Sequence, residues 1–380
     1  MSDSLAAQFE QIFQHSATGH VSAPGRVNLI GEFTDYNLGY VLPCALEFAT
    51  EVMYSTRVDN RVIVHSANYP GESDSFDVSE PIEQGNCQWG NYIRAVCFVL
   101  KRQGLTLSGL NILISSNVPQ GAGLSSSAAL EVSVIGAFNE AFQLALTTQT
   151  IAQLGQAAEN DFMHCQCGIM DQLISAQGQT NHALMIDCED LSTTAVAMPE
   201  DLKLVIVNSN YPRKLVESEY NQRRIDCEQA AHKLGVDTLR HANLTQLNAC
   251  QSTLTENEYK RAHHVITENQ RVIDTVAALK SNNMPELTKL LAASHQSLKH
   301  DFEVTVPATD GLVEIISDAL AGKGAVRMTG GGFGGAVVCL CRESEVAAVK
   351  KAVNQHYFKR FQLQADIFIC QVGNGLTKHF

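Results

Sequence analysis

Residues 118–130, which read VPQGAGLSSSAAL, combine the residue types of a phosphate-binding turn. The apolar run at 110–114 predicts a strand before them, and apolar side chains at helical spacing over 128–142 predict a helix after them. Gly121 and Gly123 lack a Cβ, so the backbone there can approach a ligand closely. Ser125, Ser126 and Ser127 place hydroxyls and amides at the expected helix start, where unpaired N–H groups and the helix dipole favour a phosphate.

Three interpretations of this turn compete. The serines could simply cap a helix, which is a common use of serine. A dinucleotide fingerprint is disfavoured, because GAGLSS lacks the third glycine and lies more than a hundred residues into the chain. The P-loop of nucleotide-binding proteins is excluded, because its lysine is missing. A phosphate site without lysine must rely on amides, hydroxyls, a helix end and a metal ion.

A second polar segment lies near the N-terminus. Residues 32–37 (EFTDYN) separate the apolar pieces VNLI and YVLP, and the surrounding glycines and prolines indicate strand–loop–strand. Carboxylates, hydroxyls and an amide suit a polyol, although by composition alone an Asx-type turn is the simpler interpretation. Arg26, beside apolar strand residues, needs a partner, and an anion is the usual one.

Two carboxylates and an aromatic residue complete the candidates. Glu159 falls near the end of a predicted helix at 148–162, where a negative charge is unfavourable and suggests a cation partner, although a solvated surface charge is the alternative. Asp171 falls at a predicted helix start and is either a general base or an ordinary first-turn residue. Trp89, the only tryptophan, opens a helical run to residue 100 and either packs in the core or stacks on an adenine.

Composition narrows the class of protein. The chain has 380 residues, enough for two domains, and its net charge of −13 excludes broad attraction to nucleic acid or anionic membranes. Its 11 cysteines include no C-x-x-C pair, which favours reduced core thiols in a cytoplasmic protein over a zinc or redox site. Cys165 and Cys167 are the two cysteines that lie close in sequence to a candidate catalytic residue, Asp171. The N-terminus lacks signal-peptide features, and no apolar run is long enough to span a membrane.

The remaining pattern predicts an α+β fold with antiparallel or mixed sheets. A helix begins near residue 5, alternation over 51–68 indicates antiparallel strands, and strands follow at 182–188 and 202–210. Helices fill 215–300, and two strands within 325–341 flank a glycine-rich turn that must pass closely by a loop or a phosphate. A helix at 345–356 and a strand at 366–370 follow. No βαβ unit repeats, and we expect two domains, 1–198 and 199–380.

Three segments together carry a family resemblance. PGRVNLIGEFTDYN, PQGAGLSSSAALE and RMTGGGFGG resemble, in order and spacing, the three motifs of the GHMP small-molecule kinases. The first is close to the signature G-R-x-N-L-I-G-E-H-T-D-Y of the galactokinase family, and CGIMDQLIS and SEYNQRR extend the similarity over nearly the whole chain. The resemblance implies two α+β domains with the active site in the cleft between them.

The resemblance also implies an activity and a set of site residues. The chain would phosphorylate D-galactose at its anomeric hydroxyl with ATP, giving galactose 1-phosphate and ADP, the first committed step of the Leloir pathway. Asp171 and Arg26 would be catalytic, and Ser127 and Glu159 would hold Mg²⁺. We expect a cytoplasmic monomer whose only partners are the sugar and Mg-ATP. The implied sugar contacts are Glu32, Phe33, Thr34, Asp35, Gly168 and Tyr220, and the implied nucleotide contacts are Ser66, Trp89, Gly121, Ala122, Gly123, Leu124, Ser125, Ser126 and Ser127.

Phe33 departs from the family motif, which has histidine there. Loss of one hydrogen bond costs only about 0.5–1.5 kcal/mol, too little to abolish activity, so the choice of sugar is affected more than the kinase chemistry. Another sugar 1-kinase, acting on N-acetylgalactosamine or L-arabinose, is therefore an alternative. A sugar sensor with little turnover is a second alternative, but the intact serine turn, Glu159 and Asp171 favour an active enzyme.

Overall fold

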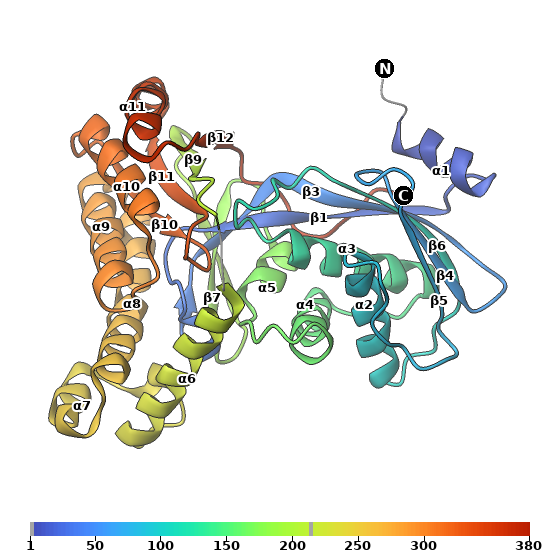
Figure 1. Ribbon diagram of the computed structural model, residues 1–380, viewed down its shortest axis with the longest axis horizontal. Helices are drawn as coiled ribbons and strands as arrows, with labels where there is room; N and C mark the ends of the chain where they lie inside the picture. Colours follow the sequence, from blue (N-terminus) through green and yellow to red (C-terminus); the bar gives the residue numbers. More distant parts are fainter. Residues whose placement is uncertain (1–3, 213–215) are drawn as a thin grey trace.

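The computed structural model describes residues 4–212 and 216–380. Its largest sheet has the strand order β13-β1-β3-β6-β4-β5, and its long strands β1 and β3 run through the centre of the molecule (Figure 1). All pairs in this sheet are antiparallel except β4 with β6. The strands are β1 (Gly19–Asn28), β3 (Pro43–Thr56), β4 (Arg61–Ser66), β5 (Ser73–Asp77), β6 (Leu110–Ser116) and β13 (Thr377–Lys378).

The sheet corrects one expectation about neighbouring strands. The alternation over 51–68 correctly indicated strands, but β3 and β4 do not pair with each other, because β6 lies between them. β4 runs parallel to β6, with Val64 opposite Ile112. The segment between these two strands is long enough for the crossover that a parallel pair requires. Alternation shows which face of a strand is buried and carries no information about its neighbour.

Four helices cover one face of this sheet, below it in Figure 1: α2 (Gly90–Arg102), α3 (Ser126–Phe142), α4 (Thr148–Ala157) and α5 (Met170–Gln177). The predicted N-terminal helix is confirmed as α1 (Leu5–Phe13), whose Phe9 packs against Met53 and Leu113. The helix predicted over 148–162 ends in a π-helical turn, η2 (Ala158–Phe162). Such turns are rare and frequent at functional sites.

A second part of the chain builds a helical layer against a four-stranded sheet (Figure 1). The sheet has the order β10-β11-β9-β12, all antiparallel, with β9 (Leu202–Asn208), β10 (Gly324–Thr329), β11 (Ala336–Arg342) and β12 (Asp366–Cys370). The helices are α6 (Val216–Leu234), α7 (Leu244–Ala249), α8 (Glu256–Lys280), α9 (Met284–His300), α10 (Pro307–Leu320) and α11 (Glu343–Phe361), with short turns η1 (Asp35–Asn37), η3 (Leu239–His241) and η4 (Gln251–Thr253).

Most predicted elements of this half are confirmed, but α10 and β13 were not predicted. In the first part of the chain, β5 and β8 (Thr193–Ala197) were not predicted either, and β8 joins β2 (Tyr40–Val41) and β7 (His182–Asp187) in a third sheet. Residue 215, where the helical region was predicted to begin, lies outside the described residues. The mixture of helices with antiparallel and parallel strands confirms the predicted α+β class.

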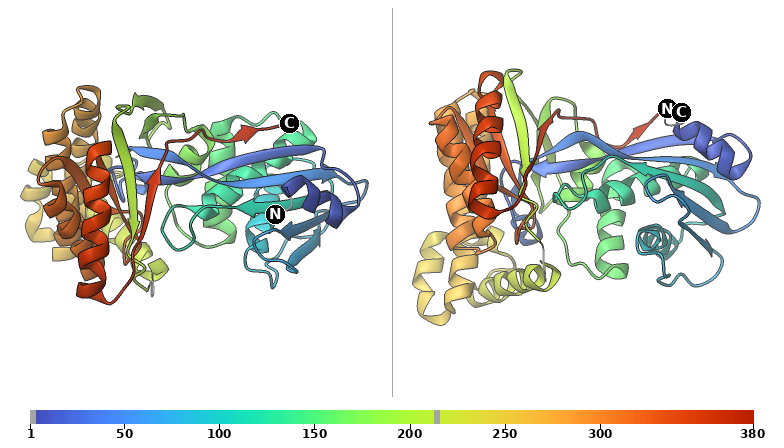
Figure 2. Two further views of the ribbon diagram at one scale, coloured as in Figure 1. Left: turned by 90° about the horizontal axis from the view of Figure 1, so that it is seen from above. Right: turned by 45° about the horizontal axis from the view of Figure 1, so that its top comes forward.

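A shared hydrophobic core joins the two parts. Val27, Leu29 and Leu42 from the first part pack in one buried cluster with Leu204 and Val338 of the four-stranded sheet. The end of the chain also returns to the first sheet, where β13 pairs with β1, and Figure 2 shows this strand beside the N-terminal region. The division at 198/199 stays a prediction, since the last residues pack with the first sheet.

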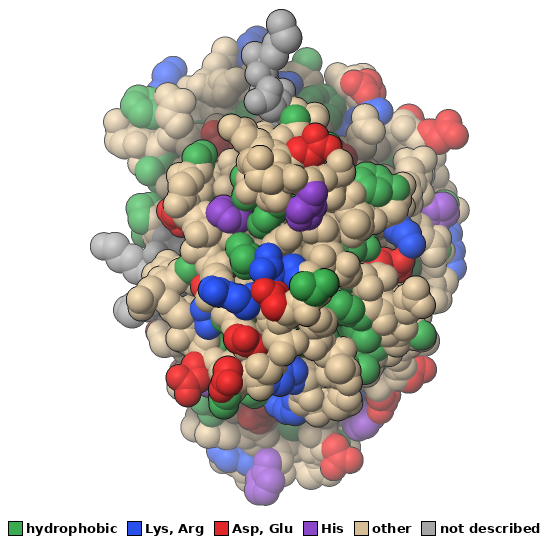
Figure 3. All heavy atoms as spheres, turned by 90° about the vertical axis from the view of Figure 1, so that its right-hand side faces the viewer, with side chains coloured by type: hydrophobic (Ala, Val, Ile, Leu, Met, Phe, Trp, Pro, Cys, Tyr) green, Lys and Arg blue, Asp and Glu red, His purple; other side chains and the backbone are tan. Residues whose placement is uncertain are grey.

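The surface and the cysteines add two observations. On the face that carries α1, acidic, basic and histidine side chains are interspersed with small hydrophobic groups (Figure 3), so the net charge is not gathered there in one acidic patch. All eleven cysteines are free thiols and most are buried. Within residues 4–212 and 216–380, no helix has the length and apolar character needed to cross a bilayer.

Candidate active site

The predicted catalytic residues, Arg26 and Asp171, form a two-pronged ion pair. Arg26 lies on β1 just after a register irregularity, and Asp171 lies in the first turn of α5. The Arg26 Nε donates to Asp171 Oδ1 at 2.6 Å, and Nη2 donates to Oδ2 at 2.8 Å. The third guanidinium nitrogen, Nη1, donates to the Gly123 carbonyl oxygen at 2.7 Å. The pair thus connects the sheet, α5 and the glycine–serine turn.

Electrostatics keep this arginine charged although it is buried. Burial is the largest single influence and lowers the pKa of Arg26, but the carboxylates of Asp171, Glu32 and Asp35 together raise it more, and the net change is upward. Fork-like arginine–carboxylate pairs are among the strongest and most directional polar contacts in proteins. The Asp171 carboxylate is therefore held in one orientation, while its side chain remains 29% exposed.

Ser125 also donates a hydrogen bond to Asp171, from its hydroxyl to Oδ2. This contact corrects the helix-capping interpretation of the serine turn. Ser125 occupies the N-cap position of α3, with a left-handed φ of 57°, but its side chain makes no capping bond. The hydroxyl is turned toward the carboxylate instead, so the serine turn contributes to the candidate active site directly.

A cavity of about 200 Å³, the first cavity, lies beside this ion pair. Four chain segments meet at this cavity. They are the π turn η2, the start of α5, the loop at 31–40 and the glycine-rich turn after β10. Nine predicted residues line it: Arg26, Glu32, Phe33, Asp35, Ser127, Glu159, Gly168, Asp171 and Tyr220. Cys165, Cys167, Met170, Gln172, Asn221, Gly330 and Gly331 line it too. From the sequence, the two cysteines and the glycine-rich turn with Gly330 and Gly331 were noted, and Met170, Gln172 and Asn221 fell within segments that carry the resemblance without a role of their own.

Gly168 and Asp35 contact each other in the wall of the first cavity. A Cβ at residue 168 would overlap the Asp35 carboxylate, so glycine is required for the two chain segments to come this close. Burial, followed by the nearby Asp171 charge, raises the pKa of Asp35 to about 6. Asp35 is thus a buried acceptor at the cavity wall that is largely charged at neutral pH.

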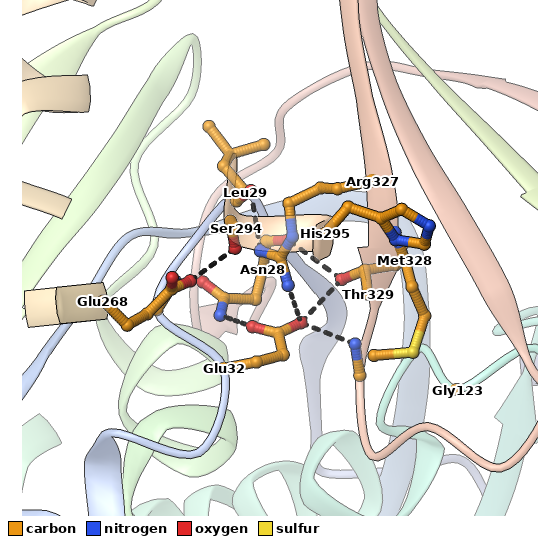
Figure 4. A network of polar contacts seen from close by, with 12 residues as sticks. Asn28, Leu29, Glu32, Gly123, Glu268, Ser294, His295, Arg327, Met328 and Thr329 are labelled. Carbon is orange, nitrogen blue, oxygen red and sulfur yellow. Dashed lines mark hydrogen bonds and ion pairs between the residues drawn. The ribbon is translucent and has the colours of Figure 1, made fainter. Parts of the chain in front are cut away.

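Glu32 has an unexpected number of protein partners (Figure 4). Its Oε1 accepts from the Thr329 hydroxyl at 3.0 Å and from the Gly330 N–H at 2.6 Å, and it lies 3.1 Å from Arg327 Nη2. Its Oε2 accepts from the Asn28 amide. The glycine-rich turn therefore passes by the 31–40 loop, one of the two neighbours that the sequence allowed. Glu32 lines the cavity and also fastens that loop to β10.

The remaining predicted sugar contacts divide into two kinds. Tyr220 lines the cavity, and burial raises the pKa of its hydroxyl well above the usual value, which keeps it a donor. Phe33 lines the cavity but also stacks on Phe302, with ring centroids 4.6 Å apart. Thr34 does not line it, because its hydroxyl donates to the carbonyl oxygens of Gly31 and Tyr40. Thr34 shapes the loop from within.

A second cavity of about 340 Å³ lies beside the serine turn and the start of α3. Four predicted nucleotide contacts, Ser66, Trp89, Ser126 and Ser127, line it. Two further aromatic residues, Tyr69 and Tyr92, line it as well; only their aromatic character could have indicated this. Ser127 lines both cavities, so they meet at the start of α3.

The other predicted nucleotide contacts form the turn itself. Gly121 and Gly123 have left-handed φ values of 72° and 74°, which accounts for glycine at both positions. Ala122 and Leu124 are buried beneath the turn. Ser125 faces Asp171 rather than the second cavity. These residues shape the backbone between the two cavities.

The predicted metal ligands, Ser127 and Glu159, line the same cavity. A hydroxyl and a carboxylate are hard oxygen donors of the kind that Mg²⁺ prefers, and this ion usually keeps few protein ligands and takes others from phosphates and water. Residues 4–212 and 216–380 contain no cluster of three or more His, Cys, Asp or Glu that could hold a metal ion. The donor set therefore fits an Mg²⁺ that arrives with a nucleotide.

A buried acid lies behind Glu159. Glu131 on α3 is fully buried and accepts from Gln172 Nε2 at 3.0 Å. Burial first, and the neighbouring Glu159 charge second, raise the pKa of Glu131 well above its usual value, which favours the neutral form of this group. The sequence analysis missed Glu131, because a charged residue within a helix pattern is usually exposed.

The chain is similar to known families over three segments. Residues 7–56 match the galactokinase galactose-binding signature, residues 91–179 match the GHMP kinases N terminal domain, and residues 275–359 match the GHMP kinases C terminal domain. Among solved structures, the galactokinase of Lactococcus lactis, crystallised with galactose, is 34% identical, with a TM-score of 0.92 and 98% of each chain covered.

More distant structures share the fold. The mevalonate kinase of Methanococcus jannaschii is 20% identical with a TM-score of 0.66, covering 95% of this chain and 100% of the other. A D-glycero-D-manno-heptose 1-phosphate kinase from Bacteriodes thetaiotaomicron is 15% identical with a TM-score of 0.63, covering 95% and 99%. The serine turn, the Arg26–Asp171 pair and the full-length similarity agree with each other. The chain is a sugar kinase that belongs to the galactokinase family of GHMP kinases.

Proposed function

We propose that the first cavity binds D-galactose, that the second cavity binds the nucleoside of ATP, and that phosphoryl transfer takes place where the cavities meet. The observation that carries this assignment is the position of Ser127, which lines both cavities, next to the Arg26–Asp171 pair. The reaction is ATP-dependent phosphorylation of the anomeric hydroxyl, with galactose 1-phosphate and ADP as products. The galactose bound to the Lactococcus relative supports the choice of sugar.

Asp171 receives the proton in this mechanism. As the anomeric oxygen forms a bond to the γ-phosphorus, the bond to the β–γ bridging oxygen breaks and ADP leaves. The hydroxyl proton passes to the Asp171 carboxylate, which Arg26 and Ser125 hold in position. Positioning and charge neutralisation supply most of the catalysis in phosphoryl transfer, so a fixed acceptor next to a fixed cation is well suited to it.

The start of α3 binds the phosphates. The amides at this helix start and the positive end of the helix dipole attract negative charge without a lysine. The Arg26 guanidinium, which reaches the Gly123 carbonyl, adds a full positive charge beside the turn. Ser127 and Glu159 would hold Mg²⁺, which would neutralise phosphate charge when bound.

An ADP-release assay with Mg-ATP and a panel of sugars tests this function. The panel contains D-galactose, 2-deoxygalactose, N-acetylgalactosamine, L-arabinose, talose and D-glucose. Turnover that is fastest with D-galactose supports the proposal. Turnover that is fastest with another sugar assigns the chain to another sugar 1-kinase. Saturable galactose binding without turnover assigns it to the sensor class.

A further inference from the structure

The 31–40 loop has a backbone that its own sequence does not favour. Phe33 has a left-handed φ of 64°, which is uncommon for a bulky side chain. Gly31 before it has a φ of 98°. Such a conformation persists only where surrounding groups impose it. Since Glu32, Phe33 and Asp35 line the first cavity, whatever imposes this backbone also shapes the cavity.

Helix α8, more than two hundred residues later, contacts the loop through a polar stripe. His264 and Glu268 lie four residues apart, on the same face of this helix, and Asn269 lies next to Glu268 in the sequence. Each of the three side chains forms a hydrogen bond with a different backbone group of the loop. All three side chains are buried. The stripe therefore holds the loop by its backbone, independently of the loop's own side chains.

His264 holds the carbonyl of Glu32. Its Nε2 lies 3.1 Å from this oxygen, and because a carbonyl only accepts, Nε2 carries the proton. Its Nδ1 lies 2.9 Å from the Ser297 hydroxyl on α9. The imidazole also contacts the Phe302 ring at a centroid distance of 4.6 Å, and Phe302 stacks on Phe33. His264 thus supports both the backbone before Phe33 and the ring of Phe33.

Glu268 and Asn269 hold the two ends of the loop. Glu268 Oε1 accepts from the Gly31 N–H at 3.0 Å, and its Oε2 accepts from Arg271 at 2.6 Å. Asn269 Oδ1 accepts from the Tyr40 N–H at 2.9 Å. A Cβ at Gly39 would overlap that Asn269 oxygen, so the helix and the loop meet at van der Waals distance.

We propose that His264, Glu268 and Asn269 are positioning residues that hold the 31–40 loop in the conformation that binds the sugar. The inference rests on the proposed function, because it assigns this loop to the galactose site. None of the three lines either cavity, so they act through the loop and not on the substrate. Their loss loosens galactose binding and leaves the nucleotide site, beside the start of α3, intact.

Asn269 provides the sharpest test, because two variants separate the loss of its hydrogen-bond acceptor from the loss of side-chain volume. Asn269→Ala removes the acceptor for Tyr40 N–H, whereas Asn269→Asp keeps an oxygen in the same place. We expect Asn269→Ala to weaken galactose binding about 10-fold, as loss of one hydrogen bond does, with the KM for ATP within about twofold of wild type. Asn269→Asp should restore galactose binding. His264→Leu and His264→Gln form a second such pair, since glutamine retains an N–H donor.

Thr275→Val is the control on the same helix. Thr275 is fully buried, and its hydroxyl donates only to the Arg271 carbonyl within α8. This variant should lower the Tm yet leave galactose binding within about twofold of wild type. Calorimetry measures galactose binding directly, and the ADP-release assay gives the two KM values.

The outcomes separate the two proposals. If Asn269→Ala and His264→Leu bind galactose as wild type does, or weaken ATP and galactose equally, the positioning role is overturned. It is also overturned if Thr275→Val weakens galactose binding as much as they do. If wild type binds galactose without transferring phosphate, the proposed function fails, while the calorimetric comparison still decides the positioning role. If wild type does not bind galactose, both proposals fail.

Discussion

In the proposed mechanism, turnover depends on a carboxylate whose orientation two other side chains fix. Asp171 accepts from Arg26 through both oxygens and from Ser125 through one. A carboxylate held in this way loses little entropy when it receives a proton from the sugar. A group so firmly held is also easy to test, because an amide of the same shape can replace it.

Replacing Asp171 tests the proton acceptor. Asp171→Ala should lower kcat by about 10² or more, which is the range expected for loss of a general base. Asp171→Asn keeps the shape of the side chain without the charge and should lower kcat similarly. The ADP-release assay at saturating galactose and Mg-ATP measures both. Near-normal turnover in a folded Asp171→Ala protein would remove this residue from the catalytic step.

Phe33→His tests the departure from the family motif. Phe33 is 4% exposed and stacks on Phe302, so the substitution removes apolar packing, although histidine tolerates a left-handed φ better. An aromatic pair contributes about 0.5–1.5 kcal/mol beyond its buried area, and we expect a net loss of about 1 kcal/mol of stability. Because the Phe33 ring packs on Phe302, we expect the rank order of sugars to stay the same, in contrast to the expectation from the motif alone. A change in preferred sugar, measured with the same panel, would show that Phe33 selects the sugar.

At the scale of elements, two short loops must approach each other for the first cavity to exist. The segment before α5 passes the 31–40 loop at Gly168, where no side chain fits. The glycine-rich turn after β10 passes the same loop and binds Glu32 through the Gly330 N–H. Close backbone approach, more than any one side chain, sets the shape of this cavity.

Gly168→Ala tests this approach. The added methyl group would overlap the Asp35 carboxylate and displace it, so the KM for galactose should rise about 10-fold or more while the KM for ATP stays near its wild-type value. Gly331→Ala is the matched control. Residue 331 lines the same cavity, but a Cβ there would meet only Tyr220, at 3.8 Å. Equal KM values in both variants would show that the contact with Asp35 does not matter for sugar binding.

At the scale of the whole molecule, buried charges and a buried imidazole join the two parts of the chain. Burial lowers the pKa of His264 to about 4, although Glu268 opposes this effect and Arg271 adds to it. Burial raises the pKa of Glu268, but the nearby Arg271 charge, with smaller effects from other neighbours, lowers it more, to about 2. Both residues contact the 31–40 loop from α8. Acid should therefore weaken the connection between the two parts.

The pH dependence of stability follows from His264. The pKa of His264 in the folded protein lies below its unfolded value of 6.5. Its contribution to the free energy of unfolding is therefore full above pH 6.5 and is lost as the pH falls toward 4, a total of about 3 kcal/mol. Glu268 likewise stabilises the folded protein more at high pH than at low pH, but its contribution to the free energy of unfolding is lost only below about pH 4.5. Asp35, with its pKa raised to about 6, has the opposite sign: its contribution is present below pH 3.8 and is lost as the pH rises through 6.

Urea unfolding of wild type and His264→Gln between pH 7 and pH 4.5 isolates the contribution of His264 to the pH dependence of stability. The difference in free energy of unfolding between the two proteins should shrink as the pH falls, because only wild type carries the imidazole. Asp35 titrates in both proteins and cancels in the difference. A difference that stays constant across this range would show that His264 does not resist protonation in the folded state.

Local features followed from the sequence alone. The turn that contains Gly121 and Gly123, the helix after the serines and the strand before them all depend on neighbouring residues, and the structure has each of them. The three family segments likewise depend on residue types in order, and they led to the fold, to more than half of the residues that line the first cavity and to only four of those that line the second.

Contacts between distant segments were decided by the tertiary structure. Periodicity reports which face of an element is buried but not what buries it, so the insertion of β6 between β3 and β4 could not be foreseen. For the same reason, the burial of Glu131 could not be predicted, since its charge suggested exposure. Nor could the contacts between the α8 stripe and the 31–40 loop. A buried polar residue must be satisfied by a partner that only folding supplies, and that partner can lie hundreds of residues away.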